Sequence, residues 1–403
     1  MAKLAKASLM LKRIAINYKY KHSKRDKNCW AFGEWFGDRC NDNSFYLANY
    51  VAKNEPEISI YWIAKKNCSG TELLDPRIKV VEMDSAEAKQ ILSRAGAAFV
   101  NEGVQDLSGD FLNYSSGAVI VNLWHGVPWK KIGMDSYSGV AGKLYSKLVL
   151  SLQSYSYVVT SSEVCSNALK SAFLIKDSDK LIRSGLPRNS LFYDPKETAA
   201  CRKQLISFLD DRYGGIDDET KIITYMPTFR DRNEKIVDLK STDISRQLND
   251  CLRMHNAVLL QKAHYVSQKR DSREKLKDDL DRILYLDEYA SQELLAASDI
   301  LITDYSSCFF DFLILDRPII HFLYDYDYYA NKDRGLYYTC EEAACGDIAA
   351  NVDQLRDSIV ENLENPDKNR ALRDRMRKKH IIYDSKDCCR IITDVVRAAA
   401  GLR

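Results

Sequence analysis

The 403-residue chain contains no run of apolar residues that approaches the ~20 needed for a membrane-spanning helix. Its eleven cysteines include no C-x-x-C pair, and no secretory signal sequence precedes them. We therefore expect neither an integral membrane protein, nor a disulfide framework, nor a zinc site. Reduced thiols in the cytoplasm are expected instead, with the adjacent Cys388 and Cys389 serving as packing residues.

Two common phosphate-binding patterns are also missing. The sequence has neither G-x-x-x-x-G-K-[ST] nor G-x-G-x-x-G, so neither an ATPase P-loop nor a dinucleotide fingerprint explains a phosphate site in this chain. It has no internal repeat and no low-complexity tract. The net charge of +2 says little about partners, and no nucleic-acid partner is expected.

The first 27 residues, in contrast, are strongly basic. They hold nine Lys or Arg residues and a single acid, Asp26. Apolar residues that could form one stripe beside these lysines are Leu4, Leu9, Met10, Ile14 and Ile16. Two interpretations stay open: a helix that lies on an anionic membrane surface, or a solvated basic tail that leads into the first strand.

Short runs of β-branched and aromatic residues alternate with helix-length segments along the whole chain. The runs cover residues 60–64, 80–83, 97–101, 118–124 and 157–162, and then 222–228, 258–264, 283–286, 299–304 and 319–323. They are almost continuously apolar, which indicates buried parallel strands in βαβ units. The predicted fold class is α/β, with two doubly wound, Rossmann-like domains that face each other across a cleft.

The chain is long enough for two domains of ordinary size. We expect a basic segment at 1–27, an N-terminal domain at 28–190, a C-terminal domain at 191–375, and a C-terminal helix at 376–403 that packs back on the N-terminal domain. Turn residues mark the break near 185–187. Open α/β sheets bind ligands outside the carboxyl ends of their strands, so the active site is expected on loops that follow strands.

The motif NLWHGVPWKKIG, residues 122–133, follows the strand predicted at 118–124. Gly126 and Pro128 force the chain to turn, which places His125 at the carboxyl end of that strand. An imidazole titrates near neutral pH, as a general base requires, and Lys130 and Lys131 add positive charge suited to a phosphate. Taken alone, His125 is equally consistent with a hydrogen-bonded residue that stabilises the turn.

The motif ILITDYSSCFFDFLILDRP, residues 300–318, ends a strand at Asp304 and begins a helix at Ser306 and Ser307. Free amides at the helix start, two hydroxyls and the positive end of the helix dipole together make an anion site suited to a pyrophosphate. The alternative is simple N-capping by the aspartate or a serine.

Two further loops follow predicted strands of the second domain. YMPTFRDR, residues 225–232, presents Arg230 as a bidentate phosphate clamp. VLLQKAHY, residues 258–265, ends with Lys262 and His264 on one face of an extended segment, where they could hold a phosphoryl group as charge develops. Each could instead be ordinary surface charge. The coincidence of four such loops at strand ends indicates a two-domain phosphate-handling enzyme, without naming its donor.

Six segments occur in order along nearly the whole chain. They are FGEWFGDRCNDNSFYLANYV (32–51), WHGVPWKKIG (124–133), SGLPRNSLF (184–192), MPTFRD (226–231), TDYSSCFFDFLILDRPIIHF (303–322) and KDRGLYY (332–338). Together they resemble the CDP-glycerol glycerophosphotransferase family of teichoic-acid primases and polymerases. This resemblance implies the GT-B arrangement of two Rossmann-like domains, the second of which binds the CDP-linked donor.

Carried over by position, the resemblance implies roles for single residues. His125 and His264 match the two histidines of the family that carry catalysis, and Arg230 matches the arginine of its P-T-W-R-D motif. The residues that match those binding the donor phosphates are Asp304, Ser306 and Ser307, with Lys262 beside His264 and with Gly126, Lys130 and Arg334 in support. The departures from the family pattern are Val127 for Thr, Ser190 for Asp and Tyr265 for Pro. The changes at Val127 and Tyr265 remove no charged group.

The implied reaction is attack by an acceptor hydroxyl on the polyol-linked phosphorus of the donor, with CMP leaving. The expected partners are a CDP-polyol, with glycerol ahead of ribitol, a lipid-linked or polymeric glycan of a teichoic acid or capsule, and an anionic membrane surface. The expected location is the inner face of the plasma membrane. No cofactor is required and no metal site is expected, although a divalent cation is compatible with the chemistry. The rival interpretations are a GT-B glycosyltransferase that uses a nucleotide sugar and a non-catalytic, membrane-associated scaffold.

Overall fold

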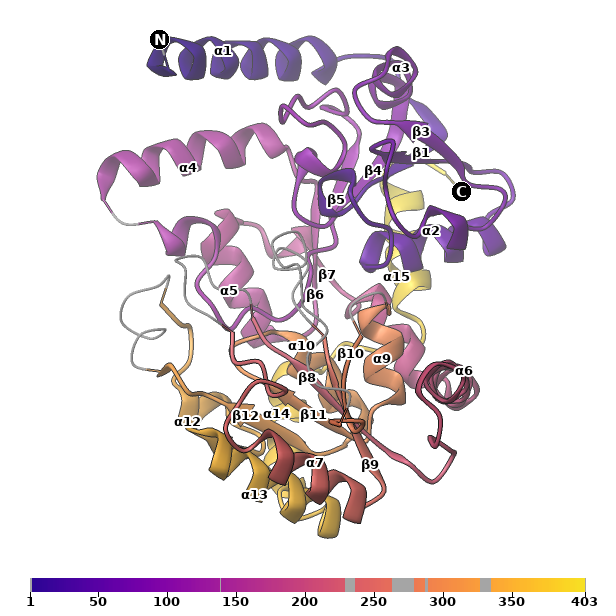
Figure 1. The fold of residues 1–403 in the computed structure, drawn as a ribbon. Coiled ribbons are helices and arrows are strands. Elements are labelled where there is room, and N and C mark those ends of the chain that lie inside the picture. Colours follow the sequence, from indigo (N-terminus) through magenta and orange to yellow (C-terminus); the bar gives the residue numbers. More distant parts are fainter. Residues whose placement is uncertain are drawn as a thin grey trace. The chain divides into compact units, whose positions relative to one another are not determined.

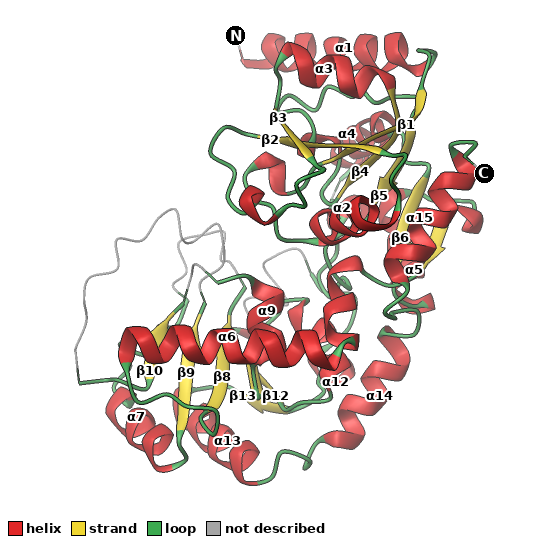
Figure 2. Ribbon diagram, turned by 90° about the vertical axis from the view of Figure 1, so that its right-hand side faces the viewer, coloured by secondary structure: helices red, strands yellow, loops and turns green. Residues whose placement is uncertain are grey.

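The computed structural model describes residues 2–137, 139–228, 236–262, 279–286, 289–326 and 335–402. The chain divides into two compact units. Unit 1 comprises Met1–Val127, Ile132–Ser190 and Ile382–Arg403, and unit 2 comprises Pro128–Lys131 and Leu191–Ile381. Each unit is built around one parallel β-sheet that is flanked by helices (Figure 1, Figure 2).

The sheet of unit 1 has seven parallel strands in the order β3-β2-β1-β4-β5-β6-β7. Their bounds are β1 (Asp26–Phe32), β2 (Ser59–Ala64), β3 (Lys79–Glu82), β4 (Ala95–Val100), β5 (Val119–Asn122), β6 (Tyr157–Thr160) and β7 (Leu181–Arg183). All positions of β4 are buried. A strand covered on both faces needs apolar residues throughout, which is why such strands appear as unbroken apolar runs in the sequence.

Helices cover both faces of this sheet. They are α1 (Ala2–Lys21), α2 (Asn43–Asn54), α3 (Ala86–Arg94), α4 (Val140–Gln153), α5 (Glu163–Phe173) and α15 (Cys388–Ala399). Leu47 of α2 and Ile392 of α15 belong to one core with Trp30 and Phe99 of the sheet. Ile91 of α3 belongs to the core on the opposite face. The last helix of the chain therefore completes the same core as its first strand.

The sheet of unit 2 has six parallel strands in the order β10-β9-β8-β11-β12-β13. Their bounds are β8 (Lys221–Met226), β9 (Ala257–Gln261), β10 (Ile283–Tyr285), β11 (Ile300–Thr303), β12 (Ile319–Phe322) and β13 (Asp347–Ala349). The helices in the described part of unit 2 are α6 (Pro195–Tyr213), α7 (Ser245–Met254), α9 (Ser291–Ala297), α10 (Cys308–Phe312), α12 (Cys340–Ala343), α13 (Val352–Glu364) and α14 (Arg370–His380). Helices α6 and α9 pack on one face, whereas α7 and α13 pack on the other.

The predicted α/β class with two doubly wound parallel sheets is confirmed. A strand overlaps each of the ten predicted runs, and three further strands, β1, β7 and β13, were not predicted. β1 begins with the polar residues Asp26, Lys27 and Asn28, and β7 and β13 have only three residues each. A charged residue interrupts the apolar run in each of the three missed strands, whereas the equally short β10 (Ile283–Tyr285) has none and was predicted.

The units divide the chain differently from the predicted segments at two places. The predicted helix at 376–403 consists of two helices, because α14 ends at His380 in unit 2 and α15 begins at Cys388 in unit 1. The short segment Pro128–Lys131, which directly follows the histidine motif, belongs to unit 2. No pattern in the sequence indicated that these four residues belong to the other unit.

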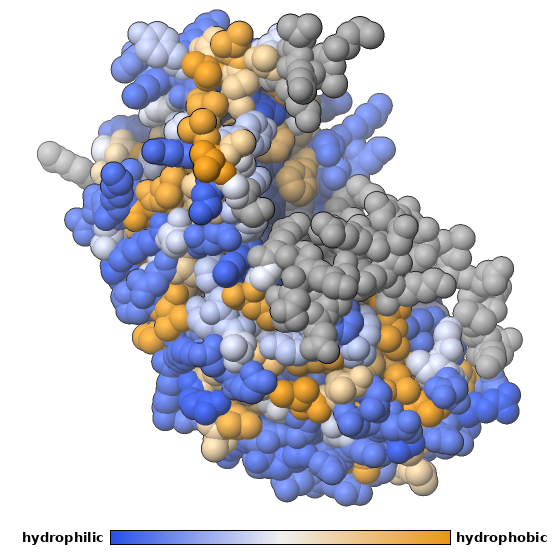
Figure 3. Space-filling model, turned by 90° about the vertical axis from the view of Figure 1, so that its left-hand side faces the viewer, coloured by the Kyte–Doolittle hydropathy of each residue, from blue (hydrophilic) through white to orange (hydrophobic). Residues whose placement is uncertain are grey.

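Helices α1 and α4 of unit 1 contact each other, and Nδ2 of Asn17 donates a 2.8 Å hydrogen bond to the carbonyl of Leu152. Both helices leave large apolar side chains exposed, namely Leu11, Ile14 and Tyr18 on α1 and Val140, Leu144, Tyr145 and Leu148 on α4. Figure 3 shows exposed hydrophobic side chains on the face of the molecule toward which these helices extend. None of the described helices is both long and apolar enough to cross a bilayer.

Candidate active site

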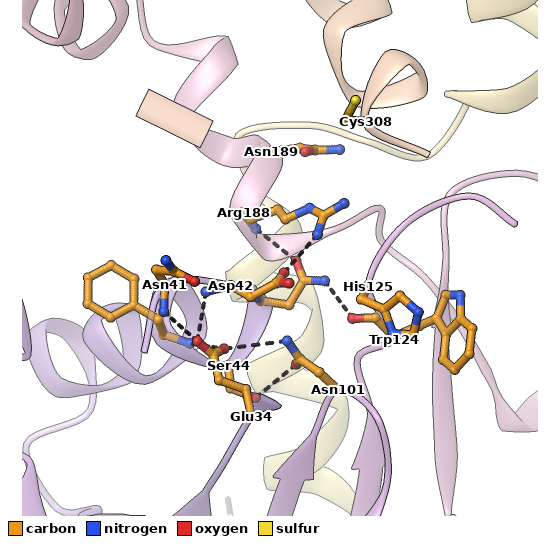
Figure 4. Close-up of polar contacts among 12 residues, drawn as sticks. Glu34, Asn41, Asp42, Ser44, Asn101, Trp124, His125, Arg188, Asn189 and Cys308 are labelled. Atoms are coloured by element: carbon orange, nitrogen blue, oxygen red, sulfur yellow. Dashed lines mark hydrogen bonds and ion pairs between the residues drawn. The ribbon is translucent and has the colours of Figure 1, made fainter. Parts of the chain in front are cut away.

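The chain turns sharply after β5, where the histidine motif begins. Trp124 has a φ of 57° and Gly126 a φ of 133°, so a bulky residue is held in the left-handed region directly before His125. The N–H of Trp124 donates to Oδ1 of Asn122 at 2.8 Å, and Nδ2 of Asn43 donates to the carbonyl of Trp124 at 2.7 Å (Figure 4). Such a conformation costs about 1–3 kcal/mol and persists only where the surroundings enforce it.

The imidazole of His125 is partly accessible, with 27% of the side chain exposed. Its Nδ1 lies 3.0 Å from Oε1 of Glu102, and the ring of Trp124 lies beside it with 3.9 Å between ring centroids. Burial lowers the pKa of His125, but the negative charges of Glu102 and Asp42 outweigh burial and the opposing charge of Arg188, so the pKa is raised above its usual value. His125 is therefore a titratable group within reach of solvent.

The neighbouring carboxylate of Glu34 is fully buried. It accepts hydrogen bonds from the backbone N–H groups of Asn41, Asp42 and Phe45, the last two at 2.8 and 3.2 Å (Figure 4). Burial and the charge of Asp42 raise the pKa of Glu34 well above its usual value. These bonds fix the backbone at the start of α2.

A buried ion pair joins two of the sequence motifs. Nη1 of Arg188 donates to Oδ1 of Asp42 at 2.9 Å, and the two side chains are only 10% and 5% exposed. Oδ2 of Asp42 also accepts a hydrogen bond from Nε1 of Trp35 at 3.0 Å. The N–H of Arg188 donates to Oδ1 of Asn43 at 3.0 Å. The D-N-S and P-R-N motifs, 146 residues apart, are thus parts of one network beside His125 (Figure 4).

Three other motifs meet within unit 2, around Trp129. Its side chain is 1% exposed, and its ring centroid lies 5.8 Å from that of Tyr305 and 5.4 Å from that of Phe309. Nε1 of Trp129 donates to the carbonyl of Tyr338 at 2.9 Å. The backbone of Lys130 pairs with that of Leu336 in an antiparallel bridge. Lys130 and Lys131, which follow the histidine in sequence, are therefore held in unit 2.

Asp304 follows β11 and is fully buried. Its Oδ1 accepts hydrogen bonds from the backbone N–H groups of Thr228 at 2.8 Å and Tyr305 at 2.6 Å. β11 and β8 are neighbours in the sheet, so this carboxylate ties the loop that follows β8 to the loop that follows β11. It organises both loops at the carboxyl edge of the sheet.

Ser306 and Ser307, where the motif predicted the helix to begin, precede α10, which begins at Cys308. Oγ of Ser306 lies 3.4 Å from the N–H of Cys308, at the long end of hydrogen-bond distances. Ser307 occupies the N-cap position, and within the described structure its side chain makes no capping hydrogen bond. Capping does not occupy the hydroxyl of Ser307, which is half-buried.

Lys262 directly follows β9 and is 6% exposed. Its Nζ donates a hydrogen bond to the carbonyl of Tyr289. The predicted residues Arg230, His264 and Arg334 lie outside the described residues. Unit 2 therefore brings Lys130, Lys262, Asp304, Ser306 and Ser307 onto one fold, whereas His125 and Gly126 belong to unit 1.

The sequence patterns did not single out Glu34, Asp42, Glu102 or Arg188. A signal for Glu102 was available, because β4 and β5 are neighbours and their register pairs Val100 with Asn122. The residues that follow these two positions leave the sheet together, which brings Glu102 to His125. Among the described residues, no group of three or more His, Cys, Asp or Glu side chains could hold a metal ion.

This chain is similar to known proteins in both sequence and fold. The teichoic acid poly(glycerol phosphate) polymerase of Bacillus subtilis (strain 168) is 27% identical over 336 residues, which are 81% of this chain and 42% of the polymerase. The teichoic acid glycerol-phosphate transferase of Staphylococcus aureus (strain NCTC 8325 / PS 47) is 27% identical over 350 residues, 83% of this chain and 84% of the transferase. The chain thus spans less than half the length of the first relative and most of the second.

The structure of the wall teichoic acid polymerase TagF superimposes with a TM-score of 0.79 at 22% identity, over 99% of this chain and 96% of that one. This likeness shows the same GT-B-like fold. The sequence model of CDP-Glycerol:Poly(glycerophosphate) glycerophosphotransferases matches residues 14–397. Because that match extends over nearly the whole sequence, the chain belongs to the CDP-Glycerol:Poly(glycerophosphate) glycerophosphotransferase family.

Proposed function

We propose that this protein transfers a polyol phosphate, with glycerol phosphate as the first candidate, from a CDP-linked donor to a hydroxyl of a lipid-linked or polymeric cell-surface glycan. The observation that carries the proposal is the placement of His125. It is a partly exposed imidazole at the carboxyl end of β5, held beside the carboxylate of Glu102. The description of the family names CDP-glycerol as the donor, and the names of the relatives, a polymerase and a transferase of glycerol phosphate, agree with the group transferred.

In the proposed reaction, the acceptor hydroxyl gives its proton to His125 while its oxygen attacks the phosphorus that carries the polyol. A bond forms between this oxygen and the phosphorus. The bond from the phosphorus to the bridging oxygen of the pyrophosphate breaks, and CMP leaves with that oxygen and the electron pair. The protonated histidine then releases its proton to solvent, so that the products are the extended glycan, CMP and a proton. No step of this reaction requires a cofactor.

Negative charge develops on the leaving phosphate, and donors placed in advance would stabilise it. We assign this role to Lys262, Ser306 and Ser307 of unit 2, and to Arg230, His264 and Arg334 outside the described residues. The hydroxyl of Ser307 at the start of α10, which makes no capping hydrogen bond within the described structure, supports this assignment. Asp304 would act indirectly, because its carboxylate holds the backbone of Thr228 and Tyr305. Gly126 and Lys130 would keep the flanking backbone in place.

The direct test is CMP release from the purified full chain, with CDP-glycerol and CDP-ribitol in separate assays and a lipid-linked glycan as acceptor. CMP formation that requires the acceptor supports the proposal. Release of a nucleoside diphosphate from a sugar donor would instead identify a glycosyltransferase. A protein that binds neither CDP-polyol in calorimetry would be a scaffold. A parallel assay with EDTA determines whether a divalent cation contributes.

The same assay measures the role of His125. His125→Ala is expected to lower kcat by roughly 10²-fold or more, because the general base is lost. The KM for the donor should change little. The matched control is His255→Gln in unit 2, where the native Nδ1 contacts the carbonyl of Cys251 at 2.9 Å. If the loss in His125→Ala is confined to KM, the imidazole binds the substrate and is not the base.

We further infer that unit 1 contacts an anionic membrane surface through α1 and α4. On α1, Leu11, Ile14 and Tyr18 recur at intervals of three and four residues and are exposed. On α4, Val140 and Leu144 are 86% and 68% exposed. Lysines lie near both stripes, at Lys12 and Lys19 on α1 and at Lys143 and Lys147 on α4. Apolar stripes flanked by lysines are the pattern of helices that bind the headgroup region of anionic bilayers.

A further inference from the structure

We propose that Glu102 is a positioning residue that fixes the orientation of His125, assigns the proton of the imidazole to Nδ1, and thereby leaves Nε2 as the atom that takes the proton of the acceptor. The catalytic meaning of this pair rests on the proposed function. The pairing of Glu102 with His125 does not depend on the proposed function, because it follows from contacts within unit 1.

The first step of the argument is the contact itself. Nδ1 of His125 lies 3.0 Å from Oε1 of Glu102, and the carboxylate side chain is 18% exposed. A carboxylate can only accept a hydrogen bond, so the facing ring nitrogen must be the one that carries hydrogen. In a neutral imidazole the other nitrogen then has a free lone pair. Nε2 is therefore the basic atom.

The second step is the rigidity of the loop that carries Glu102. The buried carboxylate of Asp106 accepts hydrogen bonds from the backbone N–H groups of Asn101 at 2.8 Å and Glu102 at 2.7 Å. It accepts a third from Phe36 at 2.9 Å. The next residue, Gly103, has a φ of 146°, and a Cβ there would lie 2.8 Å from Oε1 of Gln153. Because these contacts fix the backbone at Glu102, they also fix the direction in which its side chain leaves the loop.

The third step is the environment of the ring. Trp124 limits the movement of the imidazole from one side, and the ring of Trp35 lies 6.2 Å away between centroids. Among the described residues, the charged groups that act on His125 are Glu102, Asp42 and Arg188. Asp42 raises the pKa of His125 and Arg188 lowers it, whereas Glu102 is the strongest of the three and raises it. Loss of Glu102 should therefore shift the titration of His125 to lower pH.

The test compares wild type with Glu102→Gln, which keeps the size of the side chain and removes its charge. Glu87→Gln is the matched control, because Glu87 pairs with Lys79 on the exposed surface of the same unit. Ring Cε1–H signals of ¹³C-labelled histidine are followed by NMR through a pH titration. The chain has six histidines, and the signal of His125 is assigned by its loss in His125→Asn. The expected result is a lower midpoint for His125 in Glu102→Gln and an unchanged one in Glu87→Gln.

Kinetics supply the second readout. In Glu102→Gln, kcat should fall roughly tenfold or more, as when an orienting carboxylate is removed from a catalytic imidazole. The acid limb of the kcat profile should move to lower pH, while the KM for the donor stays near that of wild type. Glu102→Asp, which retains the charge on a shorter side chain, should restore part of the shift in the acid limb.

The two readouts separate the failure of this proposal from that of the proposed function. If wild type releases no CMP from any CDP-polyol, the proposed function fails, and the NMR titration still decides whether Glu102 sets the state of His125. If His125 titrates at the same pH in wild type and in folded Glu102→Gln, the pairing is overturned. A kcat within about twofold of wild type with an unmoved acid limb overturns its catalytic role.

Discussion

At the scale of single residues, the network around His125 contains a buried ion pair between Arg188 and Asp42. Two charges that are 10% and 5% exposed have lost most of their hydration, and each depends on the other to compensate that loss. Asp42 also accepts a hydrogen bond from the indole N–H of Trp35, and it is the N-cap residue of α2. Removal of the arginine alone would leave a buried carboxylate without its cation.

Arg188→Met is therefore expected to lower the free energy of unfolding of unit 1 by roughly 3–5 kcal/mol. The control is Arg183→Met, because Arg183 and its partner Glu163 are 39% and 56% exposed, and loss of such a surface pair costs at most about 1 kcal/mol. Urea unfolding followed by circular dichroism measures both. Equal losses in the two variants would contradict the prediction, whereas partial recovery in Asp42→Asn/Arg188→Met would strengthen it.

Residues that act through contacts between distant segments were beyond the reach of sequence patterns. His125, Lys262 and Ser307 could be singled out because each follows an apolar run that ends at a turn. Arg188 and Asp42 lie in the P-R-N and D-N-S motifs, but nothing in either motif indicates that the two pair, and only the folded chain brings them together across 146 residues. Their partner relationship depends on strand order, which the composition of neither segment encodes.

At the scale of elements, α4 is the helix whose composition fits a soluble surface least. Val140, Leu144, Tyr145 and Leu148 are all exposed on it. The double variant Leu144→Glu/Leu148→Glu should lower binding to anionic vesicles roughly tenfold or more, because it removes two exposed apolar side chains that would insert into the bilayer and adds two charges that the bilayer repels. Flotation with vesicles of phosphatidylglycerol measures the effect.

The control for α4 is Met254→Glu, since Met254 is 75% exposed and ends α7 in unit 2. It should float as wild type does. Deletion of residues 2–21 tests α1 separately. Wild-type flotation by the α4 double variant would exclude α4 from the membrane contact, and wild-type flotation by the deletion would exclude α1.

Element boundaries followed the sequence where burial on both faces demanded apolar residues, as in β4 and β9. They departed from it where a strand began with polar residues, as in β1 and β13. The start of α10 was predicted to within two residues, at Ser306 and Ser307 instead of Cys308, because a strand and a turn precede it. The path of Pro128–Lys131 was not, because an antiparallel bridge to Leu336 depends on residues that are distant in the chain.

At the scale of the whole molecule, two buried histidines make unit 2 sensitive to acid. Burial lowers the pKa of His321 to about 4, and burial with the charge of Lys379 lowers that of His380 to about 4. Nε2 of His321 accepts a hydrogen bond from the N–H of Cys345 at 3.3 Å, which protonation would remove. A histidine with a lower pKa in the folded chain binds fewer protons there than in the unfolded chain. Stability therefore decreases as the pH falls from about 6.5 to about 4.

His321→Gln should remove part of this dependence. Between pH 7 and 4.5, the free energy of unfolding of wild type should fall by roughly 2–3 kcal/mol more than that of the variant. Trp129 is the one tryptophan in the sequence of unit 2, and its ring centroid lies 6.2 Å from that of His321. The ¹⁹F signal of 5-fluorotryptophan at this position reports the unfolding of unit 2. His22→Gln, at an exposed site in unit 1, is the control, and parallel pH curves for wild type and His321→Gln would contradict the prediction.

Unit 1 is discontinuous in sequence, and this has a consequence for how the chain is made. Nζ of Lys27 donates a hydrogen bond to the carbonyl of Gly401, 374 residues away, and α15 completes the core around Trp30. A ribosome that adds roughly 5–20 residues per second delivers α15 on the order of 10–40 s after the rest of unit 1. During that interval unit 2 can close while the earlier strands remain incomplete. Unit 1, which begins the chain, is therefore the last unit to complete its fold. Until α15 is made, the apolar face of the sheet that α15 covers stays exposed, and this is the surface that a chaperone would have to shield.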